Sequence, residues 1–146
     1  MEKCSGQSLI SDMHPAHAFE WKIQIEEQHF DQLNHVNNVV YLQWVQDAAA
    51  AHWEILSAGY QLDLVWVVRR HELDYLKPAF RGDELTAFTW VGESKGALSV
   101  RHVHILNQKA EVLLQAQTTW CPLDKKNFRP MRINEELHRI LASVKK

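Results

Sequence analysis

Two different spacings of apolar residues divide the first half of the chain. Across residues 19–26 apolar and polar side chains alternate, which predicts a half-buried strand. From Val39 apolar residues recur every three or four positions, as on one face of a helix, until Gly59 provides a natural end. The helical stripe consists of Tyr41, Trp44, Val45, Ala48, His52, Ile55 and Leu56. Asn37 or Asn38 is suited to cap this long helix, because its side-chain oxygen can accept from the first turn.

The second half of the chain predicts four further strands and a short helix. Turn-forming residues or prolines (Pro78 and Pro122) separate runs that are rich in β-branched and aromatic residues. These runs are 64–76, 84–93, 97–107 and 111–121. Asn134 precedes two glutamates and a short amphipathic pattern, which predicts a capped C-terminal helix. Because hairpin-linked strands pair antiparallel, we expect an α+β fold in which a five-stranded, curved antiparallel sheet wraps around one long central helix.

Composition and charge exclude several classes of function. The length of 146 residues fits one domain, and the small numbers of glycines (5) and prolines (4) leave little of the chain as linker. We therefore expect a single domain over 19–146, after a flexible leader over 1–18 that precedes the first strand pattern. A net charge of −2 without long basic runs argues against a nucleic-acid partner. The sequence shows neither a signal peptide nor an apolar run of transmembrane length, which favours a cytoplasmic protein without a membrane partner. Cys4 and Cys121 are too few to form a disulfide framework and are expected to be reduced.

The polar segment 29–38, directly before the long helix, is the strongest candidate for chemistry. A helix N-terminus presents unpaired N–H groups and a partial positive charge, which suit a polarised carbonyl or an anion. A nearby carboxylate such as Asp31 could attack that carbonyl or activate water. Asp31, Asn37 and Asn38 are equally compatible with a purely structural role, because such residues are common in turns and caps.

A resemblance to a known family favours the chemical role. The run from Asp31 to Tyr41 resembles the D-x-x-G-H-V-N-N-x-x-Y signature of hotdog-fold acyl-CoA thioesterases, in the 4-hydroxybenzoyl-CoA thioesterase-like branch. Residues 73–79 and 81–85 are similar to the second strand and following turn of that family, so the resemblance covers about residues 19–121. It implies a hotdog fold and hydrolysis of an acyl-CoA substrate to a free acid and coenzyme A, with no cofactor.

The resemblance also implies roles for individual residues. Asp31 would be the catalytic carboxylate, as general base or nucleophile, and the backbone N–H of Asn38 would polarise the thioester carbonyl. His35, Asn37 and Tyr41 would support the loop, although His35 could also orient Asp31 or protonate the leaving thiolate. The sequence departs from the signature at Asn34, where the family often has glycine, and asparagine tolerates a left-handed backbone better than most residues.

The sequence is also compatible with other functions. The protein could instead be an acyl-carrier-protein thioesterase, a hotdog dehydratase or a non-catalytic acyl-binding protein. His102 and His104 have ligand-compatible spacing on one strand face, but without a third ligand we expect no metal site. Several basic residues could contact coenzyme A phosphates, and a solvated surface is the simpler role for each. They are Arg69, Arg70, Lys77, Arg81, Lys95 and Arg101.

The pattern of the predicted strand over 64–76 also suggests self-association. Apolar residues occupy both alternating sets, with Val65 and Val67 on one and Trp66 and Val68 on the other. One helix cannot cover both faces of the sheet, and large apolar patches are rare on soluble monomers. The resembling family builds its sites at dimer interfaces. We therefore expect a homodimer or a dimer of dimers, with Asp31 facing a pocket that is partly walled by the partner subunit.

Overall fold

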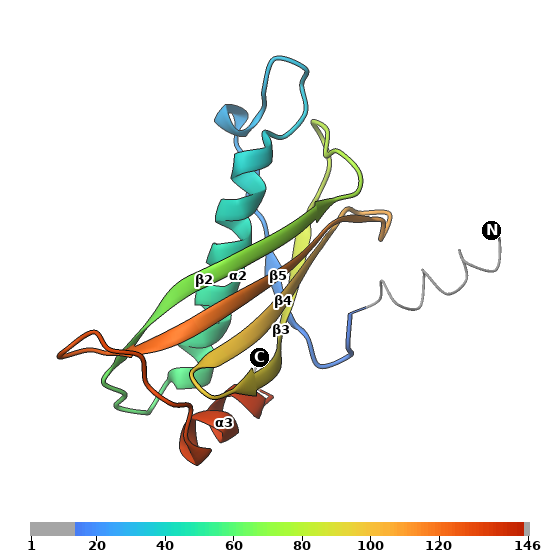
Figure 1. Cartoon of the computed structure of the whole chain (residues 1–146). Helices are drawn as coiled ribbons and strands as arrows, with labels where there is room; N and C mark the ends of the chain where they lie inside the picture. The colour runs from blue at the N-terminus through green and yellow to red at the C-terminus, as the bar shows by residue number, and fades with distance from the viewer. Residues whose placement is uncertain (1–13, 145–146) are drawn as a thin grey trace, which may run out of the picture.

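A computed structural model describes residues 14–144 of the chain (Figure 1). Most of the expected leader, residues 1–13 with Cys4, lies outside the described residues. The remainder of the leader packs on the domain: the His14 ring stacks on Phe88 with centroids 3.8 Å apart, and Ala18 is buried. Within residues 14–144, no helix is long and apolar enough to cross a membrane.

The elements occur in the predicted order of strand, long helix, four strands and short helix. They are β1 Phe19–Lys22, the 3₁₀ turn η1 Glu27–His29, α2 Asn38–Ser57, β2 Leu64–Tyr75, β3 Thr86–Lys95, β4 Leu98–Leu106, β5 Val112–Asp124 and α3 Glu135–Ala142. The strands form one antiparallel sheet in the order β1-β3-β4-β5-β2. This confirms the α+β class and the five-stranded antiparallel sheet.

The connection 76–85 separates β2 from β3, the next strand in the sequence. It is too long for a tight hairpin, and β2 pairs with β5 instead. By contrast, β3 and β4 join at a tight turn beside the Lys95–Leu98 pair, where Gly96 has a φ of 64°. β2 therefore forms one edge of the sheet, and its outer side has no strand partner within the described residues.

Two strand ends differ by three residues or more from those expected. β1 ends at Lys22 because its register with β3 ends there, although the alternation continues and Ile23 remains buried. β5 passes through Pro122 and ends at Asp124. The proline is tolerated because the pairing of β5 with β4 has already ended at Trp120, so that side of the strand has no ladder bond to lose.

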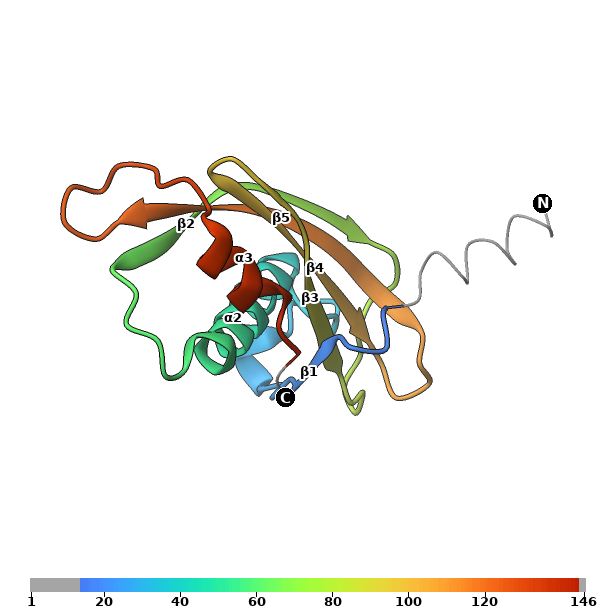
Figure 2. The ribbon, with the colours of Figure 1, turned by 90° about the horizontal axis from the view of Figure 1, so that it is seen from below.

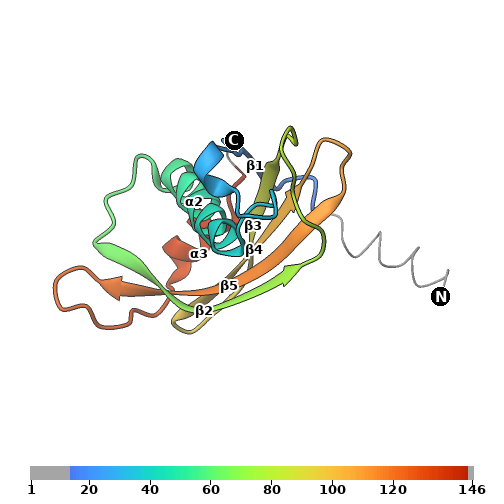
Figure 3. The same ribbon diagram turned by 90° about the horizontal axis from the view of Figure 1, so that it is seen from above.

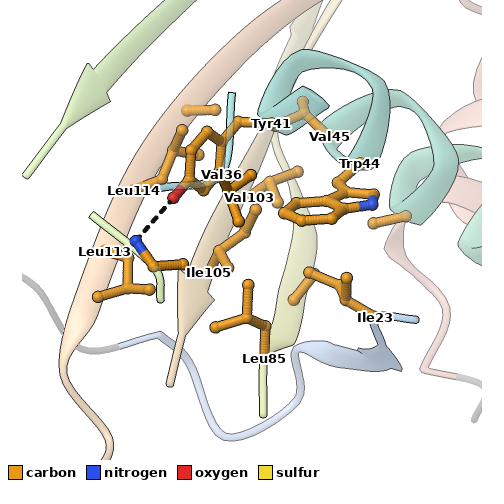
Figure 4. Packing of buried hydrophobic residues seen from close by; sticks show 14 residues of the cluster. Ile23, Val36, Tyr41, Trp44, Val45, Leu85, Val103, Ile105, Leu113 and Leu114 are labelled. Atoms are coloured by element: carbon orange, nitrogen blue, oxygen red, sulfur yellow. Dashed lines mark hydrogen bonds between the residues drawn. The ribbon is translucent and has the colours of Figure 1, made fainter. Parts of the chain in front are cut away.

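The helix α2 packs against one face of the curved sheet, which bends around it when viewed along the helix (Figures 2 and 3). Asn37 caps the helix, with its Oδ1 atom accepting from Val39 N at 3.2 Å, and Gly59 follows the last turn with a φ of 88°. Ala48 has no exposed surface, and its small side chain allows the helix to approach the sheet closely. The surrounding core (Figure 4) contains Ile23, Val36, Tyr41, Trp44, Val45, Leu85, Val103, Ile105, Leu113 and Leu114.

The short helix α3 covers the other end of the molecule, beside the end of α2 (Figure 2). Asn134 caps it as predicted, with its Oδ1 atom accepting from Leu137 N at 2.8 Å. Leu137 and Leu141 pack with Ile133 against a second apolar cluster that includes Trp53 and Trp66. Cys121 is buried and is not in a disulfide, as expected.

Candidate active site

The backbone of the loop before α2 holds Asp31 in place. The carboxylate Oδ1 accepts hydrogen bonds from the backbone N–H groups of Leu33, at 2.9 Å, and His35, at 3.1 Å. In the return direction Asp31 N donates to His35 O at 2.8 Å. Oδ2 has no hydrogen bond to any described residue, and the side chain is exposed. One carboxylate oxygen is thus fixed, whereas the other is free to contact water or a substrate.

Asn34 allows this tight loop to close. Its φ of 63° lies in the left-handed region, where asparagine is among the few tolerated side chains. Asn34 N donates to Asp31 O at 3.1 Å, which completes the turn. Asn34, where the resembling signature has glycine, thus has a backbone conformation that glycine adopts freely.

The segment that follows β2 braces the loop from outside. Val36 N donates to Ala79 O at 3.2 Å, and His35 forms a β-bridge with Phe80. Arg81, predicted as a possible phosphate contact, instead pairs with Glu27 at 2.5 Å and donates to Asn34 Oδ1 at 3.3 Å. The hydrogen bond from Arg81 lowers the pKa of the Glu27 carboxyl. The two segments rise side by side above α2 (Figure 1).

The first turn of α2 lies beside Asp31. Asn37 Oδ1 satisfies the N–H of Val39, and Asn37 O accepts from Val40 N at 2.9 Å. The N–H of Asn38, the first helical residue, has no acceptor among the described residues. An unpaired N–H at a helix start carries part of the roughly half positive charge of the macrodipole. This end of the helix is suited to stabilise negative charge on a bound oxygen.

Asp31 and the helix start border one open pocket of about 420 Å³. Its lining residues are Asp31, His35, Val36, Asn37, Asn38, Tyr41, Tyr75, Leu76, Lys77 and Pro78. All five residues that the sequence singled out for the site therefore share this pocket.

Tyr41 holds the two walls of the pocket together. Its hydroxyl accepts from Ala79 N at 3.1 Å, the bond drawn in Figure 4, and thereby links α2 to the segment after β2. The side chain is buried, and this burial raises the pKa of its hydroxyl. Tyr75 forms a second link by donating from its hydroxyl to Asn38 O at 3.2 Å.

Some lining residues had no specific signal in the sequence. Tyr75, Leu76 and Pro78 reach the pocket because β2 ends there, and their place depends on pairing with β5. Lys77 is the one residue of the six proposed phosphate contacts that lines this pocket, and it pairs with Glu111 at 2.9 Å. Arg101 lies elsewhere, buried beside His52.

The histidines form no metal centre that the structure describes. His102 and His104 lie on β4, and both ring systems contact Trp90. Within residues 14–144, no group of three or more His, Cys, Asp or Glu side chains is placed to hold an ion. His52 is a core histidine, as expected, and its Nδ1 atom lies 2.8 Å from Arg101 Nη1.

Comparisons with known proteins support the same architecture. Residues 15–141 match the model of the acyl-ACP thioesterase N-terminal domain. The chain is 26% identical over 132 residues to the long-chain acyl-CoA thioesterase FadM of Escherichia coli, covering 86% of this chain and 98% of that protein.

Solved structures give the same result for the fold. A Thermus thermophilus thioesterase in complex with coenzyme A and zinc superposes with a TM-score of 0.75 at 21% identity, covering 85% of this chain and 97% of the other. The DHNA-CoA thioesterase of Staphylococcus aureus gives a TM-score of 0.73 at 19% identity, covering 84% and 87%. The resemblance to hotdog thioesterases is thereby confirmed. The chain has the hotdog-type fold and belongs to the acyl-ACP thioesterase N-terminal domain family.

Proposed function

We propose that this protein hydrolyses an acyl-CoA thioester to the free acid and coenzyme A. The observation that carries the proposal is the shared pocket, in which the free carboxylate oxygen of Asp31 and the unpaired N–H of Asn38 border the same space. A thioester carbonyl placed there would meet a base or nucleophile and an oxyanion donor together. The name of the Escherichia coli relative supports an acyl-CoA substrate.

The reaction needs water as its second substrate. With Asp31 as general base, Oδ2 takes a proton from water while the water oxygen attacks the carbonyl carbon. The carbonyl oxygen becomes an oxyanion, which the N–H of Asn38 and the positive end of α2 stabilise. Collapse of this intermediate breaks the carbon–sulfur bond, and the coenzyme A thiolate takes up the proton held by Asp31.

The nucleophilic route uses the same atoms. Oδ2 of Asp31 attacks the carbonyl carbon, coenzyme A leaves as its thiolate, and water then hydrolyses the mixed anhydride to release the acid. In both routes the supporting residues act by position. Asn37 orders the first turn, Tyr41 ties that turn to the opposite wall, and the backbone of His35 fixes Oδ1.

We further propose that the site is completed by a second copy of the chain. Large apolar side chains that are about half exposed or more gather on the loop, the first turn of α2, the end of β2 and the segment that follows it. They are Leu33, Val39, Tyr75, Leu76 and Phe80. Among residues 14–144 the outer edge of β2 also has no strand partner, and open edges favour pairing with another chain. A homodimer across this region would cover these five side chains, which form an apolar rim, and would close one side of the pocket. A dimer of dimers is compatible with the same contact.

The family match gives a second candidate substrate, an acyl group carried on acyl carrier protein. Thiol release from a panel of acyl-CoA esters, and from the same acyl groups on the carrier protein, tests both. We expect a higher kcat/KM for the coenzyme A esters. A higher kcat/KM for the carrier-protein esters would favour the second candidate. Binding of acyl-CoA without thiol release from either panel would identify a non-catalytic acyl-binding protein.

A further inference from the structure

Arg101 on β4 is a buried cation without an acidic partner. Its side chain points into the core face of the sheet and retains 6% of its exposed surface. Nη1 lies 2.8 Å from His52 Nδ1 and donates to Thr89 Oγ1 at 3.0 Å. No carboxylate of the described residues forms an ion pair with it. Burying an unpaired charge is costly, so this arrangement calls for a compensating group.

His52 cannot supply that compensation. To lie against the guanidinium it must be the neutral tautomer with Nδ1 as acceptor, since a guanidinium has donors alone. Burial, with a further contribution from Arg101, lowers the pKa of His52 to about 4, in keeping with a neutral ring at neutral pH. The cluster of Arg101, His52 and Thr89 thus keeps its positive charge.

A second pocket, of about 310 Å³, opens beside Arg101. It lies between the C-terminal half of α2 and the beginning of β2, away from the pocket that contains Asp31. Its lining residues are Ala49, Ala50, Trp53, Leu64, Val65, Trp66, Arg101 and Trp120. Arg101 is the single charged residue in this lining, and the other walls are aromatic or aliphatic. The volume is at the lower end of the range of about 300–1,000 Å³ for small-molecule sites.

The unpaired polar groups around this second pocket are all donors. The N–H groups on Nε and Nη2 of Arg101 have no acceptor among the described residues. The indole Nε1 atoms of Trp66 and Trp120 are likewise buried without a partner. A ligand that matches this environment carries an apolar body and a negatively charged acceptor, which a planar guanidinium can bind through two parallel hydrogen bonds.

We propose that this second pocket binds an apolar carboxylate, with the carboxylate on Arg101 and the hydrocarbon against Trp53, Trp66 and Ala49. The carboxylate could belong to a free carboxylic acid or to the far end of an acyl group. Both sources present the same chemistry to the pocket, and they differ in what remains attached to the other end of the ligand.

Octanoate, with 1-octanol as its neutral counterpart, tests the site directly. Because three tryptophans line the pocket, binding should change the intrinsic fluorescence saturably and raise the Tm. We expect octanoate to bind about tenfold or more tightly than octanol, since hydrogen bonds to charged groups are the strong class. Equal affinity for the two probes would overturn the proposal. This binding experiment does not depend on any enzymatic activity.

Two variants locate the binding. Arg101→Met keeps the length of the side chain and removes the charge, so the preference for octanoate over octanol should disappear. Ala50→Phe fills the exposed side of the pocket without touching Arg101, so binding of both probes should be lost even if the first variant does not fold. Arg70→Met, on the exposed surface of β2, serves as the control and should bind as the wild type does. A preference for octanoate over octanol that survives Arg101→Met, or binding of either probe that survives Ala50→Phe, would contradict the proposal.

A second experiment rests on the proposed thioesterase function and distinguishes a free carboxylic acid from the far end of an acyl group as the source of the carboxylate. If the carboxylate belongs to the acyl group, the acyl chain must be long enough to reach Arg101, which lies against His52 far along α2 from Asn38. Hexadecanedioyl-CoA should then have a lower KM than palmitoyl-CoA in the wild type, and Arg101→Met should remove this difference. Equal KM values, together with intact octanoate binding, would assign the pocket to a free acid. Loss of activity on both esters with octanoate binding retained would contradict the proposed function and leave the carboxylate site supported.

Discussion

Asp31 and His35 are joined by two hydrogen bonds of opposite direction, each of which is donated by a backbone N–H group. The N–H of His35 donates to Asp31 Oδ1 at 3.1 Å, and the N–H of Asp31 donates to the carbonyl of His35 at 2.8 Å. Neither bond uses the imidazole, so the contribution of His35 to the position of the carboxylate comes from its backbone. The geometry fixes Oδ1 of Asp31 and leaves Oδ2 without a hydrogen bond to the described residues, in a side chain that lines the pocket.

The left-handed backbone at Asn34 predicts a graded response to substitution. Asn34→Gly should change the free energy of unfolding by less than about 1 kcal/mol, because glycine adopts this φ freely while the contact with Arg81 is lost. Asn34→Val should cost about 1–2 kcal/mol or more, since its branched side chain opposes a positive φ. Chemical denaturation of both variants measures the difference. Equal stability of the two would show that the turn does not impose this backbone conformation in solution.

The buried His52 predicts a loss of stability in acid. Its pKa of about 4 in the folded protein lies below the ordinary value of 6.5, so the unfolded chain binds this proton more readily. The free energy of unfolding should therefore be highest above pH 6.5 and fall as the pH decreases towards 4. Burial also lowers the pKa of His71 and His102, which adds to the same trend.

Denaturation of His52→Asn between pH 7 and pH 4 measures this contribution. Asparagine can keep an acceptor near Arg101 but does not titrate, so the pH dependence should become shallower. His138→Asn, on the exposed surface of α3, is the matched control and should keep the wild-type slope. An unchanged slope in His52→Asn would mean that another group controls acid stability.

Patterns within short stretches of sequence predicted much of this architecture, but they did not predict which distant strands pair. The period of the stripe that includes Trp44 and Ala48 predicted α2, with Asn37 as one of two candidate caps and Gly59 at its end, because those signals lie within a few residues of each other. The gathering of Asp31, His35, Asn37, Asn38 and Tyr41 around one pocket also follows from their proximity along the chain.

The residues whose positions the sequence did not predict have two different causes. The pairing of β2 with β5 depends on contacts between distant segments, and it carries Tyr75 and Leu76 into the pocket. Arg101 shows that a usable pattern can be overlooked: it alternates in phase with Val103 and Ile105, both buried, which places it on the core face of β4. Its charge favoured a surface position, yet the side chain is buried against His52 and Thr89 and lines the second pocket.

The spacing of His102 and His104 without a third ligand predicts activity that is independent of a divalent ion. Chelation should leave the rate of thiol release unchanged, because the proposed steps use the carboxylate of Asp31 and a backbone N–H. The check is a comparison of kcat before and after extended dialysis against a chelator. Loss of activity that returns with added zinc, but not with magnesium, would overturn this prediction and require a role for metal in the reaction.

The exposed apolar rim around the pocket predicts an obligate oligomer. Light scattering at micromolar concentration should give an active species of at least twice the chain mass of 17.0 kDa. Val39→Glu should shift the mass towards the monomer, because Val39 is 69% exposed in the first turn of α2 and a glutamate there favours the helix itself. Val39→Thr is the near-isosteric control. A fully active wild-type species of 17.0 kDa would contradict the shared site.

The most direct test of Asp31 as the base or nucleophile is the turnover of Asp31→Asn on an acyl-CoA ester that the wild type hydrolyses. The asparagine oxygen can still accept from Leu33 and His35, so the loop and the Tm should be retained while the base or nucleophile is lost. Asp63→Asn, on an exposed carboxylate before β2, is the control and should keep wild-type activity. We predict that kcat of Asp31→Asn falls by about 10²–10⁴-fold. A decrease of less than about tenfold with an unchanged Tm would show that another group carries the chemistry.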